Sequence, residues 1–472
     1  MGSNLVSRLK AIVGSEHLTD SYVDRRAYAY VNGFGGDFSY ILPDVVVLPE
    51  STEEVSKIIL LANETKTPVV PRGAATNMLG VNVANRGGIM MDMSLMNKTI
   101  DIDEGNMIVT ADAGCSVYRI MHDLDKIGLE FPVAPLFTSA VQIGASAACN
   151  ISGLHMTRFG RIGDNITGLE VVLPTGEIVT LGSGAYKSGL GFYHRYTGGP
   201  DLIGLFVNAC GATGVITKVA VKVRPKPNFL GYLAYGWRRD QARDLTAALD
   251  KVQRNPIYDC YLTNHWFYTE RAEVLGLPPD AHFLACFTID GHNEEALAFE
   301  RDRVTRISEE HYGVAISGLA EFLVAPPHYR IWTAVTPWIK REQTFYFFGP
   351  VRKFADIYDL FEEVTTKYGF WNYEHRPMWF SFHGRNTINP FPMIMMDNPS
   401  DQDELDRIRR WWDEFNTRVV EMGCTQYNLG DAFPKENYEA LGPLWDLTRK
   451  IKRFLDPNDI MNPSETYSGD TA

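Results

Sequence analysis

The chain has no stretch of apolar residues long enough to suggest a membrane span. Nowhere in its 472 residues does an uninterrupted apolar run approach the roughly 18 residues that a transmembrane helix needs. The first residues carry no hydrophobic signal-peptide core, and Val6 stands where a myristoylation signal requires Ser or Thr. The sequence therefore predicts a cytoplasmic protein without a transmembrane segment.

Cysteine is scarce, and the few cysteines are far apart in the sequence. None of them forms a C-x-x-C pair, so the chain encodes neither a zinc ribbon nor an iron–sulfur cluster. We expect reduced thiols that are mostly buried. The six cysteines are Cys115, Cys149, Cys210, Cys260, Cys286 and Cys424.

Positive charge is also in short supply. There are 45 Lys and Arg residues against 58 Asp and Glu residues, which gives a net charge of −13. Nucleic acid is bound through clustered Lys and Arg, so it is not expected as the main partner. A local basic pocket for an anionic ligand remains possible. The length predicts roughly two to four domains.

The two common nucleotide-binding motifs are absent as well. The chain has no G-x-x-x-x-G-K-[ST], and no G-x-G-x-x-G follows a predicted strand. Two runs of small residues are present instead, at 71–80 (PRGAATNMLG) and 144–150 (GASAACN). Small side chains let the backbone approach a large anion closely, so that N–H groups can cradle it. These runs predict a bulky phosphate-bearing cofactor held by backbone.

The first half of the chain alternates between strand and helix patterns. A helical pattern covers 4–30, and strand 45–48, a helix ending near 63 and strand 69–70 then form a β-α-β unit. Residues 168–180 read as a β-hairpin that turns at Thr175 and Gly176. Further expected elements are strands at 88–92, 107–111 and 219–223, helices at 117–127 and 202–209, and a break at 224–227.

Aromatic residues become frequent after about residue 228. Helix and strand patterns alternate there in a way that is typical of an α+β domain with a mainly antiparallel sheet. Residues 436–455 form a final helical pattern. Helices are expected at 240–253, 293–310, 353–367 and 401–422, and strands at 258–263, 282–288, 344–349 and 377–383.

Six short motifs follow one another along the chain. They are LPESTEEV at 48–55, PRGAATN at 71–77, MD at 91–92 with MN at 96–97, GLEVVLPTGE at 168–177, GATGVIT at 211–217 and DPNDIMNP at 456–463. Taken in this order, they resemble the FAD-linked oxidases with a para-cresol-methylhydroxylase-type (PCMH-type), or vanillyl-alcohol-oxidase-type, FAD-binding domain. The resemblance implies an α+β fold: a two-lobed PCMH-type FAD-binding domain at 1–227, a substrate or cap domain at 228–435, and a segment at 436–472 that returns to the FAD domain.

The resemblance also implies which residues hold FAD. The first loop would bind the pyrophosphate, residues 135–150 would line the other side, and Asn462 would lie near the flavin ring. The implied residues are Pro71, Arg72, Gly73, Ala74, Ala75, Thr76, Asn77, Leu79, Gly80, Pro135, Ser139, Ala140, Ile143, Gly144, Ser146, Asn150, Gly153, Gly160, Asp164, Ile166, Gly214, Val215, Ile216 and Asn462.

We expect the FAD to be non-covalent. Parts of the family attach flavin through a His in the first loop, but residues 73–77 contain none. Another route uses a Cys in the later loop, where this chain has Ser139 and Ala140. His383 and Tyr427 remain alternative attachment points.

The glycolate oxidase and D-lactate dehydrogenase branch provides the first substrate hypothesis, a 2-hydroxy acid that gives up a hydride. This chain departs from that branch at its metal site. Phe382 and Asn389 stand at the metal-binding His positions, and residues 427–430 lack the later Glu and His. We therefore expect no metal. Val335 stands where that branch has its substrate Arg.

A second branch, which oxidises para-alkylphenols and benzylic alcohols, is the alternative. Tyr427 resembles a phenol-binding tyrosine of that branch, although Asn428 stands where Arg is expected. The aromatic-rich second half favours a flat or apolar substrate. A non-catalytic flavoprotein subunit of a redox complex is a further alternative.

The candidate catalytic residues are His383, Arg385 and Tyr427. A histidine can act as a base near neutral pH, and Arg385 lies two residues on, hence on the same face of a strand. Arg341, Lys340 and His375 are further candidates. Electrons would pass to an external acceptor, which could be oxygen, a quinone, an electron-transfer flavoprotein, a cytochrome or an iron–sulfur partner. We expect a homo- or hetero-oligomer.

Overall fold

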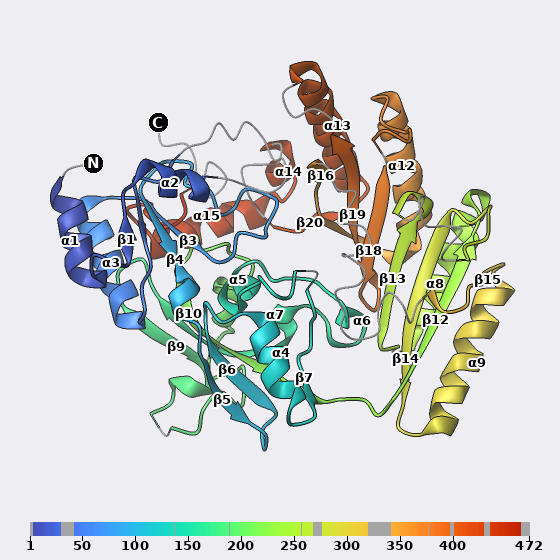
Figure 1. Ribbon diagram of the computed structural model, residues 1–472, viewed down its shortest axis with the longest axis horizontal. Coiled ribbons are helices and arrows are strands. Elements are labelled where there is room, and N and C mark those ends of the chain that lie inside the picture. The colour runs from blue at the N-terminus through green and yellow to red at the C-terminus, as the bar shows by residue number, and fades with distance from the viewer. Residues whose placement is uncertain are drawn as a thin grey trace.

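The chain folds into two groups of strands that lie next to each other (Figure 1). Elements from α1 to β11 form one group, and the strands and helices from β12 to α13 form the other, whereas the late helix α15 lies beside the first group. The computed structural model describes residues 3–29, 42–135, 137–187, 189–255, 257–267, 276–319, 341–375, 377–396, 401–428 and 435–463.

A four-stranded sheet opens the fold, in the order β1-β2-β4-β3. Strands β2 (Val45–Val47) and β3 (Val69–Arg72) each run parallel to β4 (Ile89–Asp92), which lies between them. Helix α3 (Thr52–Thr65) connects β2 to β3, as predicted. The sheet also contains β1 (Leu18–Thr19), and the predicted helix at 4–30 is two helices, α1 (Ser3–Val13) and α2 (Tyr22–Tyr28).

A second sheet of five antiparallel strands follows, in the order β5-β6-β10-β8-β9. The predicted hairpin is present as β8 (Ile166–Val172) and β9 (Ile178–Gly182). At 202–209, where a helix was expected, there is only the short 3-10 turn η3 (Ile203–Leu205). The remaining elements here are β5 (Thr99–Asp103), β6 (Ile108–Asp112), α4 (Val117–Asp125), β7 (Leu129–Glu130), α5 (Ile143–Ala148), α6 (Met156–Phe159), α7 (Ile162–Asn165), β10 (Val215–Lys222) and β11 (Arg224–Pro225).

The second group is built on a nine-stranded antiparallel sheet. It confirms the expected antiparallel α+β architecture, but strands β12 and β19 were not predicted. Pro390 and Pro392 lie within β19, and proline is unusual in a central strand because it cannot donate a backbone hydrogen bond. The strands are β12 (Phe229–Trp237), β13 (Asp259–Asn264), β14 (Phe283–Gly291), β15 (Val314–Ala315), β16 (Arg341–Thr344), β17 (Phe347–Pro350), β18 (Met378–His383), β19 (Thr387–Met396) and β20 (Thr425–Gln426).

The two faces of this sheet contact different neighbours. One face packs against four helices, and its core includes Trp237 and Trp379. The other face turns toward the first half of the chain, where Phe380 and Phe382 cluster with Met156. The covering helices are α8 (Ala242–Arg254), α9 (Glu294–Glu310), α12 (Phe354–Lys367) and α13 (Gln402–Glu421). Within the described ranges, no helix has both the length and the apolar character needed to cross a membrane.

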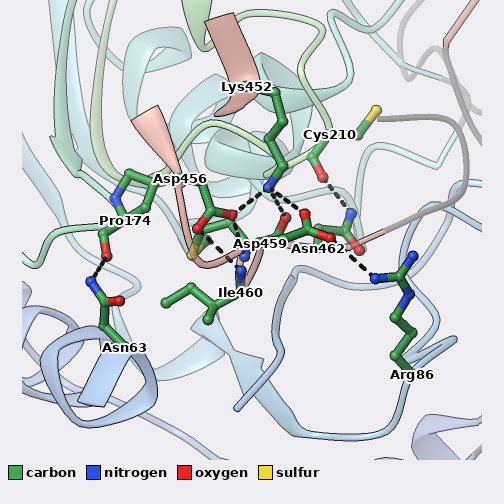
Figure 2. Close-up of polar contacts among 10 residues, drawn as sticks. Asn63, Arg86, Pro174, Cys210, Lys452, Asp456, Asp459, Ile460 and Asn462 are labelled. Atoms are coloured by element: carbon green, nitrogen blue, oxygen red, sulfur yellow. Dashed lines mark hydrogen bonds and ion pairs between the residues drawn. The ribbon is translucent and has the colours of Figure 1, made fainter. Parts of the chain in front are cut away.

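The end of the chain returns to β3 through a buried ion pair (Figure 2). Lys452 near the end of α15 (Pro443–Leu455) pairs with Asp456, and both side chains are almost fully buried. The Asp456 carboxylate also accepts hydrogen bonds from the backbone N–H groups of Ile460 (3.1 Å) and Met461 (2.8 Å). The Ile460 carbonyl in turn accepts from Val69 N at 2.7 Å. The ion pair therefore fixes the C-terminal segment along β3, directly before the loop at 71–77.

Replacing Asp456 by alanine should destabilise the fold strongly. The change leaves the Lys452 ammonium buried without its counter-ion and two backbone N–H groups without acceptors, which costs about 3–5 kcal/mol of unfolding free energy. Urea-induced unfolding followed by circular dichroism measures the effect. The matched control is Asp240→Ala, which removes an exposed ion pair with Arg238 and should leave the unfolding midpoint unchanged. Equal midpoints for the two variants would contradict this role of Asp456.

Candidate active site

A cavity lies between the first half of the chain and the inner face of the nine-stranded sheet. It contains about 1270 Å³ that protein atoms do not fill, part of it open to solvent. Both small-residue runs contribute to its wall, although they are about seventy residues apart in the sequence. The implied FAD residues that line it are Pro71, Arg72, Gly73, Ala74, Ala75, Thr76, Asn77, Pro135, Gly144, Ser146, Gly214, Val215 and Ile216.

The first wall is the loop into which β3 runs. Here the backbone lies so close to the facing helix that no side chain fits at Gly73. A Cβ on Gly73 would lie 2.7 Å from the Ala145 Cβ and 3.1 Å from the Gln142 Oε1. Ala75 has a positive φ of 56°, which is uncommon for a residue other than glycine. The backbone of this loop therefore packs directly against the facing helix.

The second wall is formed by Gln142 and helix α5. It is equally tight, because a Cβ on Gly144 would lie 2.5 Å from the Ala113 Cβ. The Gly144 N–H donates to the Ala113 carbonyl at 2.8 Å, which fixes the start of α5 beside β6. The close approach to the end of β6 explains why position 144 is glycine.

Aromatic side chains from the nine-stranded sheet and the segment after it form the third wall. Tyr346, Phe382, Phe391 and Tyr427 line the same cavity as the two small-residue loops. The Tyr427 hydroxyl accepts a hydrogen bond from the backbone N–H of Ser152 at 2.7 Å. The cavity can therefore hold a long ligand that contacts backbone at one end and aromatic rings at the other.

A chain of asparagines connects the two halves beside the cavity. The Asn77 Nδ2 donates to the Asn428 Oδ1 at 3.1 Å. The Asn428 Nδ2 then donates to the Asn208 Oδ1 (2.5 Å) and to the Cys149 carbonyl (2.9 Å). Asn428 is almost completely buried, so these bonds are shielded from water. They set the position of the aromatic wall relative to the loop at 71–77.

Several implied FAD residues do not line the cavity. Asn462 does not line the cavity, and its Nδ2 donates to the Cys210 carbonyl at 2.6 Å (Figure 2). The same Nδ2 donates to the Val81 carbonyl at 2.9 Å and thereby ties two wall segments together. Ser139 and Ala140 are exposed. The others outside the lining are Leu79, Gly80, Ile143, Asn150, Gly153, Gly160, Asp164 and Ile166.

The structure separates the predicted pair of His383 and Arg385 from the cavity. Phe382 faces the cavity, so strand alternation directs His383 to the opposite, helix-covered face. There its ring nitrogens bond to Gln253 (2.9 Å) and Ser381 (3.1 Å), and burial lowers its pKa to about 3. Arg385 is exposed at the surface. The prediction that these two residues form a base and an anion clamp is thereby corrected, because neither reaches the site.

The other candidate residues have different surroundings. Tyr427 lines the cavity, whereas His375 is buried against helix α13, where its Nε2 lies 3.1 Å from the Glu404 Oε1. Arg341 begins β16, and only its backbone is described. Lys340 and Val335 lie outside the described residues.

Phe382 and Asn389, which stand where the related branch has metal-binding histidines, make other contacts in this structure. Phe382 lines the cavity, and the Asn389 Nδ2 donates to the Phe347 carbonyl at 2.9 Å. Across the described ranges, no three side chains of His, Cys, Asp or Glu gather in a way that could hold a metal ion. Of the later stretch, Tyr427 and Asn428 are described, and residues 429–430 lie outside.

Polar groups in the cavity wall suit a cofactor with many hydrogen-bonding atoms. The Gln142 Oε1, the Ser152 Oγ and both amide atoms of Asn82 are buried and have no hydrogen-bond partner among the residues that the structure describes. Such groups cost free energy unless a ligand satisfies them. FAD offers ring N–H and carbonyl groups, hydroxyls and a pyrophosphate, so the residues present fit this cofactor.

Sequence reasoning missed several residues of the wall. The aromatic wall comes from strands whose faces could not be assigned without the fold, and Cys210 reaches the cavity from a loop that carried no motif of its own. Gln142 and Cys149 lie within the segment 135–150 that the resemblance implied, although neither was singled out as a cofactor-binding residue. The missed lining residues include Ser152, Cys210, Tyr346 and Phe391.

The fold and the cavity define a two-lobed FAD-linked oxidoreductase. Residues 43–182 match the family described as FAD binding domain, and residues 263–466 match the FAD linked oxidases, C-terminal domain. The chain belongs to the FAD-linked oxidases with a PCMH-type FAD-binding domain, as its motifs predicted.

Known relatives extend this assignment over the whole chain. Glycolate oxidase subunit GlcD of Bacillus subtilis (strain 168) is 25% identical over 98% of this chain and 96% of that protein. D-lactate dehydrogenase of Anaerostipes hadrus is 26% identical over 90% of this chain and 89% of that protein. A D-lactate dehydrogenase [cytochrome], mitochondrial, of Arabidopsis thaliana is 36% identical, over 47% of this chain and 37% of its own length.

Solved structures show the same fold at low sequence identity. The crystal structure of p-cresol methylhydroxylase with substrate bound has a TM-score of 0.84 and 17% identity, and the match covers 98% of this chain and 96% of that one. A 4-ethylphenol oxidase from Gulosibacter chungangensis has a TM-score of 0.80 at 17% identity, with the same coverage. At this identity the likeness concerns the fold alone.

Replacing Gly73 by alanine should weaken FAD binding. The added Cβ collides with Ala145, so the loop has to move away from α5, and we expect the dissociation constant for FAD to rise by about tenfold or more. Fluorescence titration of FAD into flavin-depleted protein measures this. Gly204→Ala is the matched control, because Gly204 is exposed and a Cβ there meets nothing within 4 Å. Unchanged FAD affinity in Gly73→Ala would show that the loop does not form the binding wall.

Proposed function

We propose that the protein is an FAD-dependent dehydrogenase or oxidase that removes a hydride from the C–H of a 2-hydroxy acid. Bound FAD supplies the hydride acceptor, and the electrons then pass to an external acceptor. Two relatives that cover almost the whole chain are named for glycolate and D-lactate, which are such acids. Within this proposal, residues 1–227 bind FAD, 228–435 supply the cap, and 436–472 return to the FAD domain.

The observation that carries the substrate proposal is the position of Arg161. Its guanidinium carbon lies 4.4 Å from the ring centre of Tyr427, a cavity residue, and 4.5 Å from that of Phe348. The Arg161 Nε and Nη2 are buried and have no hydrogen-bond partner within the described parts of the chain. Unpaired guanidinium donors in a buried place match the two oxygens of a carboxylate. We therefore assign Arg161 as the group that binds the substrate carboxylate.

Tyr427 is well placed to orient the same substrate. Because its hydroxyl oxygen already accepts from Ser152 N, the hydroxyl proton remains available for an oxygen of the substrate. The ring stacks on Phe348, with 5.6 Å between ring centres and 11° between planes, so the hydroxyl cannot easily swing away. Tyr427 thus acts in this proposal as a hydrogen-bond donor beside the Arg161 cation.

The same contacts support non-covalent FAD. Of the two alternative attachment points, His383 lies on the far face of the sheet, and the Tyr427 hydroxyl accepts a hydrogen bond from Ser152 N.

The expected electron-acceptor partner and the expected cellular location rest on the sequence and on the proposed reaction. We expect an electron-acceptor protein, such as a cytochrome or an iron–sulfur subunit, within a homo- or hetero-oligomer. Location in the cytoplasm stays a prediction.

The aromatic wall supports one alternative, the oxidation of a para-alkylphenol or benzylic alcohol. Tyr346, Phe382, Phe391 and Tyr427 offer flat apolar surface to an aromatic ring. A non-catalytic flavoprotein subunit is the second alternative, and the relative from Bacillus subtilis is itself named a subunit.

Anaerobic mixing with candidate donors distinguishes these functions. We expect the flavin absorbance of the purified protein to bleach with one or more D-2-hydroxy acids and to persist with para-alkylphenols. Bleaching by phenols alone would replace the acid by the aromatic substrate. A flavin that no donor of either class reduces would favour the subunit role.

The variant Arg161→Met should weaken binding of the substrate carboxylate while leaving the fold intact. Methionine keeps much of the packing against Tyr427 and Phe348 but removes the charge, so we expect the dissociation constant for the acid in flavin-reduction kinetics to rise about tenfold to hundredfold. Arg243→Met is the matched control, since Arg243 is exposed and pairs with Asp356 at the surface. Equal constants in both variants, at equal flavin content, would rule out Arg161 as the clamp.

A further inference from the structure

Two of the six cysteines meet in the wall of the cavity. Cys149 follows helix α5, Cys210 lies 61 residues further along the chain on the loop after η3, and both line the cavity. The backbone N–H of Cys210 donates to the Ala148 carbonyl at 2.9 Å. This bond joins the peptide group before Cys149 to that of Cys210, so the two backbones lie side by side. Both cysteines are free thiols.

The side chains of Cys149 and Cys210 interact electrostatically in the cavity wall, and the Asn77 Nδ2 approaches the Cys149 Sγ at 3.8 Å. A disulfide requires Cα atoms within about 7 Å and converging Cβ bonds. The direct backbone hydrogen bond between Cys210 and the peptide group before Cys149 is compatible with this distance requirement.

The surroundings give the two thiols different reactivity. Donation from the Cys210 thiol is the main cause of a lowered pKa at Cys149, and the Asn77 amide and the Arg161 charge act in the same direction. The same pairing, together with burial, raises the pKa of Cys210. Cys149 is also the more exposed of the two. Cys149 is therefore the nucleophile, and Cys210 is the thiol that can resolve its oxidised form.

We propose that Cys149 and Cys210 are a peroxide-sensitive dithiol that closes to a disulfide in the wall of the cavity. The Cys149 thiolate attacks one oxygen of the peroxide, the O–O bond breaks, and hydroxide leaves as water after taking up a proton. Cys149 is then a sulfenic acid. The Cys210 sulfur attacks the Cys149 sulfur, the S–O bond breaks, and the second hydroxide leaves as water with the Cys210 proton. Two thiols are oxidised and one peroxide is reduced to two waters.

A second pair of neighbouring cysteines in the chain serves as an internal comparison. Cys260 on β13 and Cys286 on β14 lie on adjacent strands, but Cys260 pairs across from Phe287 and Cys286 from Tyr261. They therefore project to opposite faces of the sheet and belong to different cores. Burial raises the pKa of both thiols. Cys260 and Cys286 cannot form a disulfide unless the strands move, so we do not expect peroxide to oxidise this second pair.

Closing the disulfide would change the cavity wall. It would link the segments that Asn428 bridges through the Cys149 carbonyl and the Asn208 side chain. It would also convert the free Cys149 sulfur that the Asn77 amide approaches into a disulfide sulfur. Because Asn77 and both cysteines line the cavity, oxidation acts directly on the surface that faces the ligand.

The test uses the full-length, flavin-containing protein, reduced and then treated with hydrogen peroxide. Thiol titration in denaturant should show the loss of two of the six thiols, and peptide mapping should show one disulfide, between Cys149 and Cys210. Retention of all six thiols, or a disulfide between any other cysteines, would overturn the proposal. This wild-type measurement decides the matter even where a variant fails to fold.

Three variants test the assigned roles. Cys210→Ser should stop at a Cys149 sulfenic acid, which dimedone traps, and Cys149→Ser should lose thiols at least about tenfold more slowly than wild type. Cys115→Ser is the matched control, because Cys115 is fully buried away from the cavity lining and two thiols should still be lost. Trapping of Cys210 rather than Cys149, or unchanged thiol loss in Cys149→Ser, would contradict the assignment.

Discussion

The close contact between the loop at 71–77 and helix α5 is the constraint on which the rest of the site depends. It requires glycine at position 73, since a Cβ there would lie 2.7 Å from Ala145. The contact brings two backbone segments to one cavity and keeps side chains out of the space between them. The pairing of Val69 with Ile460, held by the buried Lys452–Asp456 ion pair, aligns the strand that enters the loop. The strand that leads into this loop is therefore held in place by a segment almost four hundred residues later in the chain, at Ile460.

The second half of the chain completes the site through a few specific bonds. Asn77 contacts Asn428, and Ser152 N donates to Tyr427, so the aromatic wall is fixed to the FAD-binding wall by hydrogen bonds that are largely shielded from water. Arg161 belongs to the first half but stacks on rings of the second. The small-residue wall and the aromatic wall therefore meet in one cavity, and the Arg161 cation lies against the aromatic ring of Tyr427 that lines it.

The sequence predicted local features better than the assembly of the site. The hairpin at 168–180, the four cap helices and the backbone-lined loop follow from turn residues, caps and small side chains, which act over a few positions. The faces of β18 could not be assigned in this way. Only the fold shows that Phe382 faces the cavity, that His383 points to the opposite face, and that Arg385 lies beyond the end of the strand. Strand β19 was hidden by Pro390 and Pro392. Arg161 and the contact between Cys149 and Cys210 depend on distant segments and left no local pattern.

A crystal structure of the protein with FAD and a D-2-hydroxy acid tests the central claim most directly. The account predicts the pyrophosphate against the backbone of Gly73 to Asn77, the flavin ring toward the aromatic wall, and the acid's carboxylate on the Arg161 guanidinium beside the Tyr427 hydroxyl. A pyrophosphate bound away from this loop, or a carboxylate held by other residues with Arg161 unengaged, would contradict it.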